Sequence, residues 1–158
     1  CVMEGVRPVL AEIQALVVPS SFGNPRRVSN GVEYNRAMLL LAVLEKRGGL
    51  LLGNCDAYLN VLGGLSLDEP AADLAAMLAL ASSFRDKPVP SDLAAIGEVG
   101  LTGELRAVSN LGQRLSEVRR LGFTKCLIPK RIQGKLAAPE GLELIRVANI
   151  REALAALL

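Results

Sequence analysis

Segments with the pattern of strands alternate with segments with the pattern of helices along most of this chain. Apolar alternation predicts strands over residues 9–18, 55–62, 125–129 and 142–147, and a hairpin or two short strands over 94–108. Start and stop signals predict helices over 32–47, 70–85 and 110–122, with a last helix opened by Asn149 and Glu152. This order predicts an α/β (α+β) domain of two layers, in which helices cover sheets.

The core of such a domain must be aliphatic. Apolar residues make up 51% of the 158 residues, but only 3% are aromatic and none is tryptophan. The predicted helix 70–85 is rich in alanine, and we interpret its alanine face as core. The longest apolar run, Ala37 to Leu44, is too short to span a bilayer, so no membrane partner is expected. The length suits one domain over residues 1–158.

The chain contains no histidine, which excludes Ser-His and Cys-His nucleophile pairs and the usual zinc sites. Cys1, Cys55 and Cys126 are odd in number and widely spaced, and we expect them to be reduced thiols of a cytoplasmic protein. There is no Gly-rich phosphate loop and no Cys-x-x-Cys pair. No metal or cofactor is therefore expected to bind this chain.

Positive charge is concentrated in two stretches, although the net charge is only +2. Residues 106–135 contain eight lysines and arginines against one glutamate, and residues 19–47 contain five against two. Most of these cations are arginine, whose planar guanidinium can donate two parallel hydrogen bonds to the oxygens of a phosphate. The pattern favours a surface that faces a polyanion, and an ordinary solvated surface is the alternative.

Two short stretches resemble the active site of Lon-type proteases. Those enzymes carry Asp-Gly-Pro-Ser-Ala-Gly, and residues 68–73 lie in the same frame with Ala71 at the serine. Residues 109–114 resemble the turn that leads to the general-base lysine, with Arg114 in its place. A methyl group cannot attack a carbonyl, and a guanidinium stays protonated. The resemblance implies that both members of the catalytic dyad are absent and that no residue is catalytic.

A second resemblance is carried by five segments: Glu12–Val17, Ser21–Arg27, Glu33–Arg36, Leu44–Arg47 and Gly97–Arg106. With these segments, nearly the whole chain resembles the C-terminal domain of the RadA (Sms) family of bacterial DNA-repair proteins. The resemblance implies the Lon proteolytic-domain fold, akin to the second domain of ribosomal protein S5. It also implies that this chain is a fragment of a longer protein. A zinc finger and a RecA-like ATPase would lie outside the chain, with their zinc, ATP and magnesium.

The first functional hypothesis is a non-catalytic, DNA-binding domain that forms rings within a repair ATPase. The resemblance implies a homo-hexamer and partners in recombination such as RecA. Because aromatic residues are scarce, binding would use backbone phosphates rather than stacked bases. The candidate DNA-binding residues are Arg26, Arg27, Arg36, Arg106, Arg114, Arg119 and Arg120.

We expect Arg26 and Arg27 to reach outward from a loop, and Arg114 to project from the polar face of a helix capped by Asn110. One of Arg119 and Arg120 should lean towards the flank of the same helix.

Two alternatives remain open. The chain could be an oligomerisation scaffold whose arginines bind carboxylates on the acidic part of a neighbouring copy. It could also be a residual peptidase that uses another serine. The available serines include Ser66, Ser82, Ser83 and Ser109, none of which lies in the Lon frame.

Overall fold

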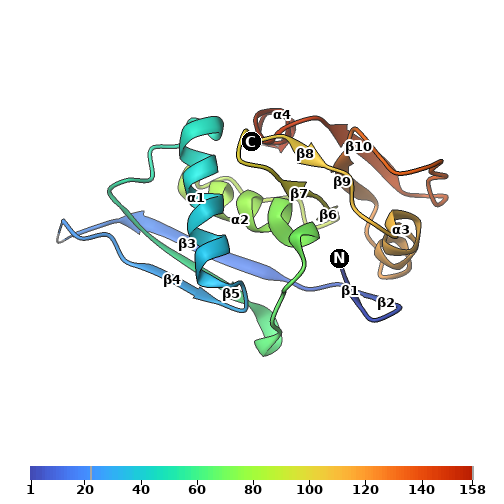
Figure 1. Ribbon diagram of the computed structural model, residues 1–158, viewed down its shortest axis with the longest axis horizontal. Helices are drawn as coiled ribbons and strands as arrows, with labels where there is room; N and C mark the ends of the chain where they lie inside the picture. The colour runs from blue at the N-terminus through green and yellow to red at the C-terminus, as the bar shows by residue number, and fades with distance from the viewer. Residues whose placement is uncertain (22, 158) are drawn as a thin grey trace.

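The computed structural model describes residues 1–21 and 23–157 (Figure 1). Phe22, in one of the resembling segments, and Leu158 lie outside the described residues. The first sheet has the order β3-β5-β4 and contains β3 (Ile13–Pro19), β4 (Arg27–Asn30) and β5 (Cys55–Val61). Strand β5 pairs antiparallel with β3 and parallel with β4.

Two helices, α1 (Tyr34–Gly48) and α2 (Asp73–Arg85), lie against one face of this sheet (Figure 1). Helix α1 begins where the Glu33 carboxylate accepts hydrogen bonds from two backbone N–H groups, and it ends at Gly49 with φ 75°. The predicted helix 70–85 is in two parts, because Pro70–Ala72 forms a separate 3-10 turn ahead of α2. The opposite face of the sheet is open, and Leu16 and Val28 are exposed there.

The second sheet is parallel, with the order β10-β9-β6. Its strands are β6 (Leu93–Ala95), β9 (Lys125–Pro129) and β10 (Glu143–Val147). The hairpin predicted over 94–108 is therefore divided. Its first residues, Ala94 and Ala95, belong to β6 of this sheet, and later residues form the antiparallel pair β7 (Glu98–Val99) and β8 (Leu105–Arg106). Helices α3 (Leu111–Arg120) and α4 (Ile150–Leu157) follow β8 and β10.

A short hairpin, β1 (Val2–Glu4) and β2 (Arg7–Val9), precedes the first sheet. The sequence predicted no element before residue 9, because three-residue strands are too short to show a period. The predicted strand 9–18 is β3, which begins four residues later than predicted. The prediction that Asn110 caps α3 is also wrong. Asn110 has φ 54°, and its side chain makes no capping hydrogen bond. The opening of α4 is confirmed, since Asn149 accepts the Glu152 N–H and Glu152 accepts the Ala148 N–H.

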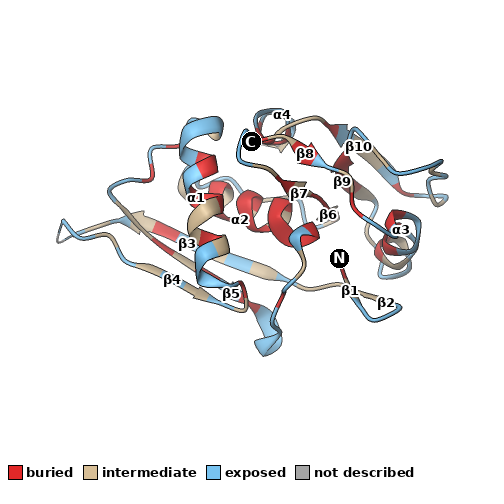
Figure 2. Cartoon of the chain, viewed as in Figure 1, coloured by how far each residue is buried: buried red, intermediate tan, exposed pale blue. Residues whose placement is uncertain are grey.

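The core is aliphatic, and α2 lies at its centre (Figure 2). The prediction that the alanine face is core is confirmed for Ala71, Ala72, Ala76 and Ala81, which are buried. Ala75 and Ala79 are half-buried. One cluster joins α1, α2, α4 and both sheets, and a second packs α3 against the parallel sheet. The α/β class with helices packed on sheets is confirmed. Among the described residues, no helix is long and apolar enough to cross a membrane.

Candidate functional site

The residue at the predicted nucleophile position, Ala71, is buried in the 3-10 turn that precedes α2. Its methyl group belongs to the second apolar cluster, with Ile96, Val108 and Leu111. Its carbonyl accepts the Gly97 N–H at 3.0 Å. The turn is therefore packed and hydrogen-bonded as a structural element, and the alanine offers no group that could react.

Arg114, the residue at the predicted general-base position, is also buried, with 2% of its side chain exposed. Its guanidinium forms an ion pair with Glu69 and donates hydrogen bonds to the carbonyls of Ser109 at 2.8 Å and Cys1 at 2.9 Å. The second oxygen of Glu69 accepts the Met3 N–H at 2.7 Å. The structure thus brings the two predicted dyad positions to one place, where Arg114 joins α3, the 3-10 turn and the β1–β2 hairpin.

This environment corrects two predictions about Arg114. It does not project from a polar face, and a phosphate of DNA cannot reach it where it lies. Arg114 shares the i, i+3, i+4, i+7 stripe of α3 with Leu111, Leu115 and Val118, which are all buried. That spacing was a signal in the sequence, but the charge of the side chain led us to assign it to the outer face.

A buried carboxylate, Asp73, lies in the first turn of α2. It forms a two-point ion pair with Arg36 of α1, including Nε to Oδ1 at 3.0 Å, and accepts the Val99 N–H at 3.1 Å. The hydrogen bond to Asp73 raises the pKa of Arg36 above its ordinary value. Arg36 was a DNA-binding candidate, but its guanidinium is engaged by Asp73 and its side chain is only 32% exposed.

The remaining candidates are more accessible. Arg26 is exposed, while Arg27 is half-buried and donates to the Leu52 carbonyl at 2.7 Å. Arg106 is exposed and lies 3.4 Å from a carboxylate oxygen of Glu104. These three arginines retain donors that face solvent.

The paired arginines at the end of α3 have different partners. Arg119 is half-buried and donates to the Glu140 carbonyl, in the segment before β10, at 3.1 Å. Arg120 is exposed and pairs with Glu117, Nε to Oε2 at 2.9 Å. Figure 1 shows that α3 and the loop before β4 lie towards opposite ends of the molecule. The candidates therefore do not form one continuous patch on a single copy of the chain.

Two of the alternative serines have structural partners. Ser82 donates to the Lys87 carbonyl at 2.5 Å, and the hydroxyl of Ser83 accepts the Val17 N–H from the edge of β3 at 2.9 Å. Among the described residues, no three Cys, Asp or Glu side chains are arranged to hold a metal ion.

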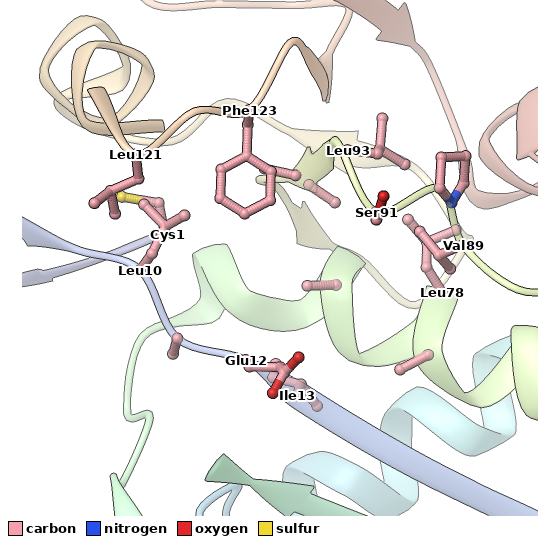
Figure 3. A pocket seen from close by; sticks show the side chains of 16 residues that line it. Cys1, Leu10, Glu12, Ile13, Leu78, Val89, Ser91, Leu93, Leu121 and Phe123 are labelled. Atoms are coloured by element: carbon pink, nitrogen blue, oxygen red, sulfur yellow. The ribbon is translucent and has the colours of Figure 1, made fainter. Parts of the chain in front are cut away.

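A groove of about 510 Å³ lies beside α2 and β6, between the first residues of β3 and the segment that leads into β6 (Figure 3). Most of its lining is apolar, with Leu78, Leu93 and Phe123 among the labelled side chains. Glu12 is the one acidic side chain that the groove contains within the described structure. Cys1 and Ser91 also line the groove, but among the described residues neither forms a hydrogen bond with Glu12. The groove therefore contains no nucleophile paired with a base.

Comparison with known proteins matches residues 56–158 to the model of the Lon protease (S16) C-terminal proteolytic domain. DNA repair protein RadA of Bacillus subtilis is 57% identical over 96% of this chain, which covers 33% of that protein. The proteins of the same name from Streptococcus pneumoniae and Listeria monocytogenes are 52% and 53% identical over 96% of the chain, with 36% and 33% of their lengths covered.

The chain thus spans about a third of the length of the curated relatives it matches. The sequence resemblance to both families is confirmed, and so is the fold it implied. The matched region contains the second sheet, α2, α3 and the turn that carries Ala71. The chain belongs to the family of the Lon protease (S16) C-terminal proteolytic domain.

Proposed function

We propose that this chain is the non-catalytic, DNA-binding and ring-forming domain of a DNA-repair ATPase. The name shared by its relatives supports a role in DNA repair. The rest of such a protein would supply a RecA-like ATPase with ATP and magnesium and a zinc finger, and it would act in the cytoplasm with recombination proteins such as RecA.

The observation that carries the non-catalytic part is the environment of Arg114. A general base must lose a proton at working pH, and an arginine beside a carboxylate does not. The guanidinium is also buried among fixed partners, so it cannot move to serve a substrate. Ala71 removes the nucleophile independently.

The DNA-binding part relies on the arginines that keep donors in solvent: Arg26, Arg27, Arg106, Arg119 and Arg120. Contacts from these residues would reach phosphates and would not distinguish base sequences. These arginines lie far apart on one copy of the chain, which supports DNA binding by an assembly rather than by a single copy. In a ring of six copies, each arginine would be repeated around one axis. The same spacing also favours the alternative of a scaffold, in which some of these arginines face a neighbouring copy.

DNA binding by this chain tests the proposal directly. We expect fluorescence anisotropy to detect binding that weakens with salt, and the Arg26→Ala/Arg27→Ala variant to reduce the slope of log affinity against log salt by about one per lost contact. Arg85→Ala, at the exposed end of α2, is the matched control and should leave the slope unchanged. Failure of the unmodified chain to bind DNA in any oligomeric state would favour the scaffold.

Peptidase activity is the second test. The purified chain should not cleave casein or short peptides, and Ala71→Ser combined with Arg114→Lys should not restore cleavage. The reason is that the amine introduced by Arg114→Lys would inherit the buried pair with Glu69 and remain protonated. Turnover by the unmodified chain that a serine-directed inhibitor abolishes would contradict the proposal.

A further inference from the structure

A cleft of about 290 Å³ lies where three segments far apart in the sequence converge. They are the end of α1, the turn between β7 and β8, and the start of α4, which approach one another in Figure 1. The cleft is lined by Arg47, Thr102, Gly103, Asn149, Ile150 and Arg151. None of the seven DNA-binding candidates from the sequence lines it.

The walls of this cleft are held by backbone hydrogen bonds. The Ile150 N–H donates to the Gly103 carbonyl at 2.8 Å, and the Leu105 N–H donates to the Ala148 carbonyl at 2.9 Å. Gly103 has φ +82°, and a Cβ there would lie 3.0 Å from the Cβ of Arg47. Glycine therefore lets the turn approach α1 closely and brings Arg47 beside α4.

Arg47 and Arg151 are both exposed, and neither forms an ion pair with any described residue. The nearest carboxylates in the sequence make other contacts. Glu45, two residues before Arg47, accepts the Gly53 N–H at 3.1 Å, and Glu152 accepts the Ala148 N–H. Glu104 pairs with Arg106 and accepts hydrogen bonds from Thr102. The cleft thus contains two guanidinium groups and no carboxylate that neutralises them.

A purely structural role explains only part of this arrangement. One nitrogen of Arg151 lies 3.5 Å from the Arg47 carbonyl in the last turn of α1, where a cation stabilises the helix end. That contact uses one of the five N–H donors of the guanidinium. It does not account for Arg47, whose charge adds repulsion to the same cleft.

We propose that this cleft binds a phosphate of a nucleic-acid backbone between Arg47 and Arg151. Paired guanidinium groups match the geometry and the charge of a phosphate group. A backbone phosphate suits the lining better than a nucleotide, because the cleft offers no aromatic side chain on which a base could stack. Arg106 lies on the strand that follows the same turn and is exposed, so it could contact a neighbouring phosphate.

This assignment rests on the proposed DNA binding and adds a specific site to it. Arg47→Gln combined with Arg151→Gln removes both charges while keeping polar side chains at the surface. With a labelled oligonucleotide, single- or double-stranded, the slope of log affinity against log salt should fall by about one for a single shared phosphate. Arg85→Gln makes the same change of charge per residue outside the cleft and should leave the slope unaltered.

The pattern of results separates the two proposals. If Arg26→Ala/Arg27→Ala lowers the slope and the cleft variant does not, the cleft assignment is overturned and DNA binding stands. If the unmodified chain binds no DNA, both fail. Equal effects of the cleft variant and of Arg85→Gln would also overturn the assignment, because they would show a general charge effect. Unchanged thermal unfolding of the cleft variant is required, since α4 begins at this cleft.

Amide NMR shifts give a second readout that does not depend on affinity. Titration with the oligonucleotide should shift the backbone amides of Thr102, Gly103 and Arg151, and the double variant should abolish these shifts. Shifts caused by inorganic phosphate but not by the oligonucleotide would show a site for free anions and would overturn the backbone assignment.

Discussion

The two ends of α3 use arginine in opposite ways. Arg114, in the first half of the helix, has 2% of its side chain exposed and pairs with Glu69, 45 positions away in the chain. Arg120, at the end of the helix, is 69% exposed and pairs with Glu117, three residues earlier in the same helix. The first pair connects separate segments of the fold, whereas the second is local and surrounded by solvent.

The difference shows that charge alone does not tell what an arginine does. A buried pair must remain complete, because removing one partner leaves a charge in a place from which water is excluded. An exposed pair contributes little, because water screens each charge and the long side chains lose entropy when they are held together. Substitutions at the two ends should therefore differ greatly in cost.

The largest expected effect is on the reactivity of a buried thiol, which tests how well water is excluded from the apolar cluster beside Arg114. Cys126 belongs to the same apolar cluster as Ala71, and burial raises the pKa of its thiol to about 12. Since the thiolate is the reactive form, its fraction at pH 8 should be about a thousandfold below that of an ordinary thiol. Cys55 is partly exposed and serves as the internal reference.

A thiol reagent at pH 8 checks this prediction, with labelled sites located by mass spectrometry. At pH 8, Cys126 should be labelled only after denaturant is added, whereas Cys55 should react in the native chain. Equal labelling of Cys55 and Cys126 in the native chain would show that water reaches this region.

The next largest effect is expected for Arg114→Met. The change keeps much of the side-chain volume but leaves the Glu69 carboxylate without its cation. We expect the free energy of unfolding to fall by about 3 kcal/mol. This value is at the lower end of the range for a broken buried ion pair, because about a quarter of the Glu69 side chain is exposed. Urea unfolding measures the change. Adding Glu69→Gln should recover part of the stability, and no recovery would contradict the ion-pair explanation.

Asp73→Asn should cost less, about 2 kcal/mol, because an amide can keep one hydrogen bond while the charge opposite Arg36 is lost. Asp68→Asn, at an exposed position before the 3-10 turn, is the control and should change the free energy of unfolding by less than about 0.5 kcal/mol. Similar costs for the two variants would show that the Arg36 pair contributes little.

The smallest effect is expected for Arg120→Ala. Its pair with Glu117 is an exposed contact three residues apart on a helix, so solvent screens both charges and the free energy of unfolding should fall only slightly. High salt should remove even this difference, whereas the cost of Arg114→Met should persist. If Arg120→Ala lowered the free energy of unfolding as much as Arg114→Met does, the two ends of α3 would not differ in this respect.

Much of the fold was predictable because helices and strands leave a local period in the sequence. The four helices were predicted close to where they lie, and the strands β5, β9 and β10 were predicted within a residue or two. The N-terminal hairpin, β4 and β6 were missed or misassigned, because strands of three or four residues are too short to show a clear period. At the candidate site, the alanine at position 71 was interpreted correctly as a buried, unreactive group, but the surroundings of Arg114 were not predicted.

Residue types and short-range spacing were enough to establish the α/β class, the aliphatic core, the absence of histidine chemistry and the methyl group at Ala71. They did not reveal that Arg114 is buried against Glu69, that Arg36 is held by Asp73, or that Arg47 and Arg151 line one cleft. These outcomes depend on which distant segments meet when the chain closes, and long-range contacts leave no period along the chain.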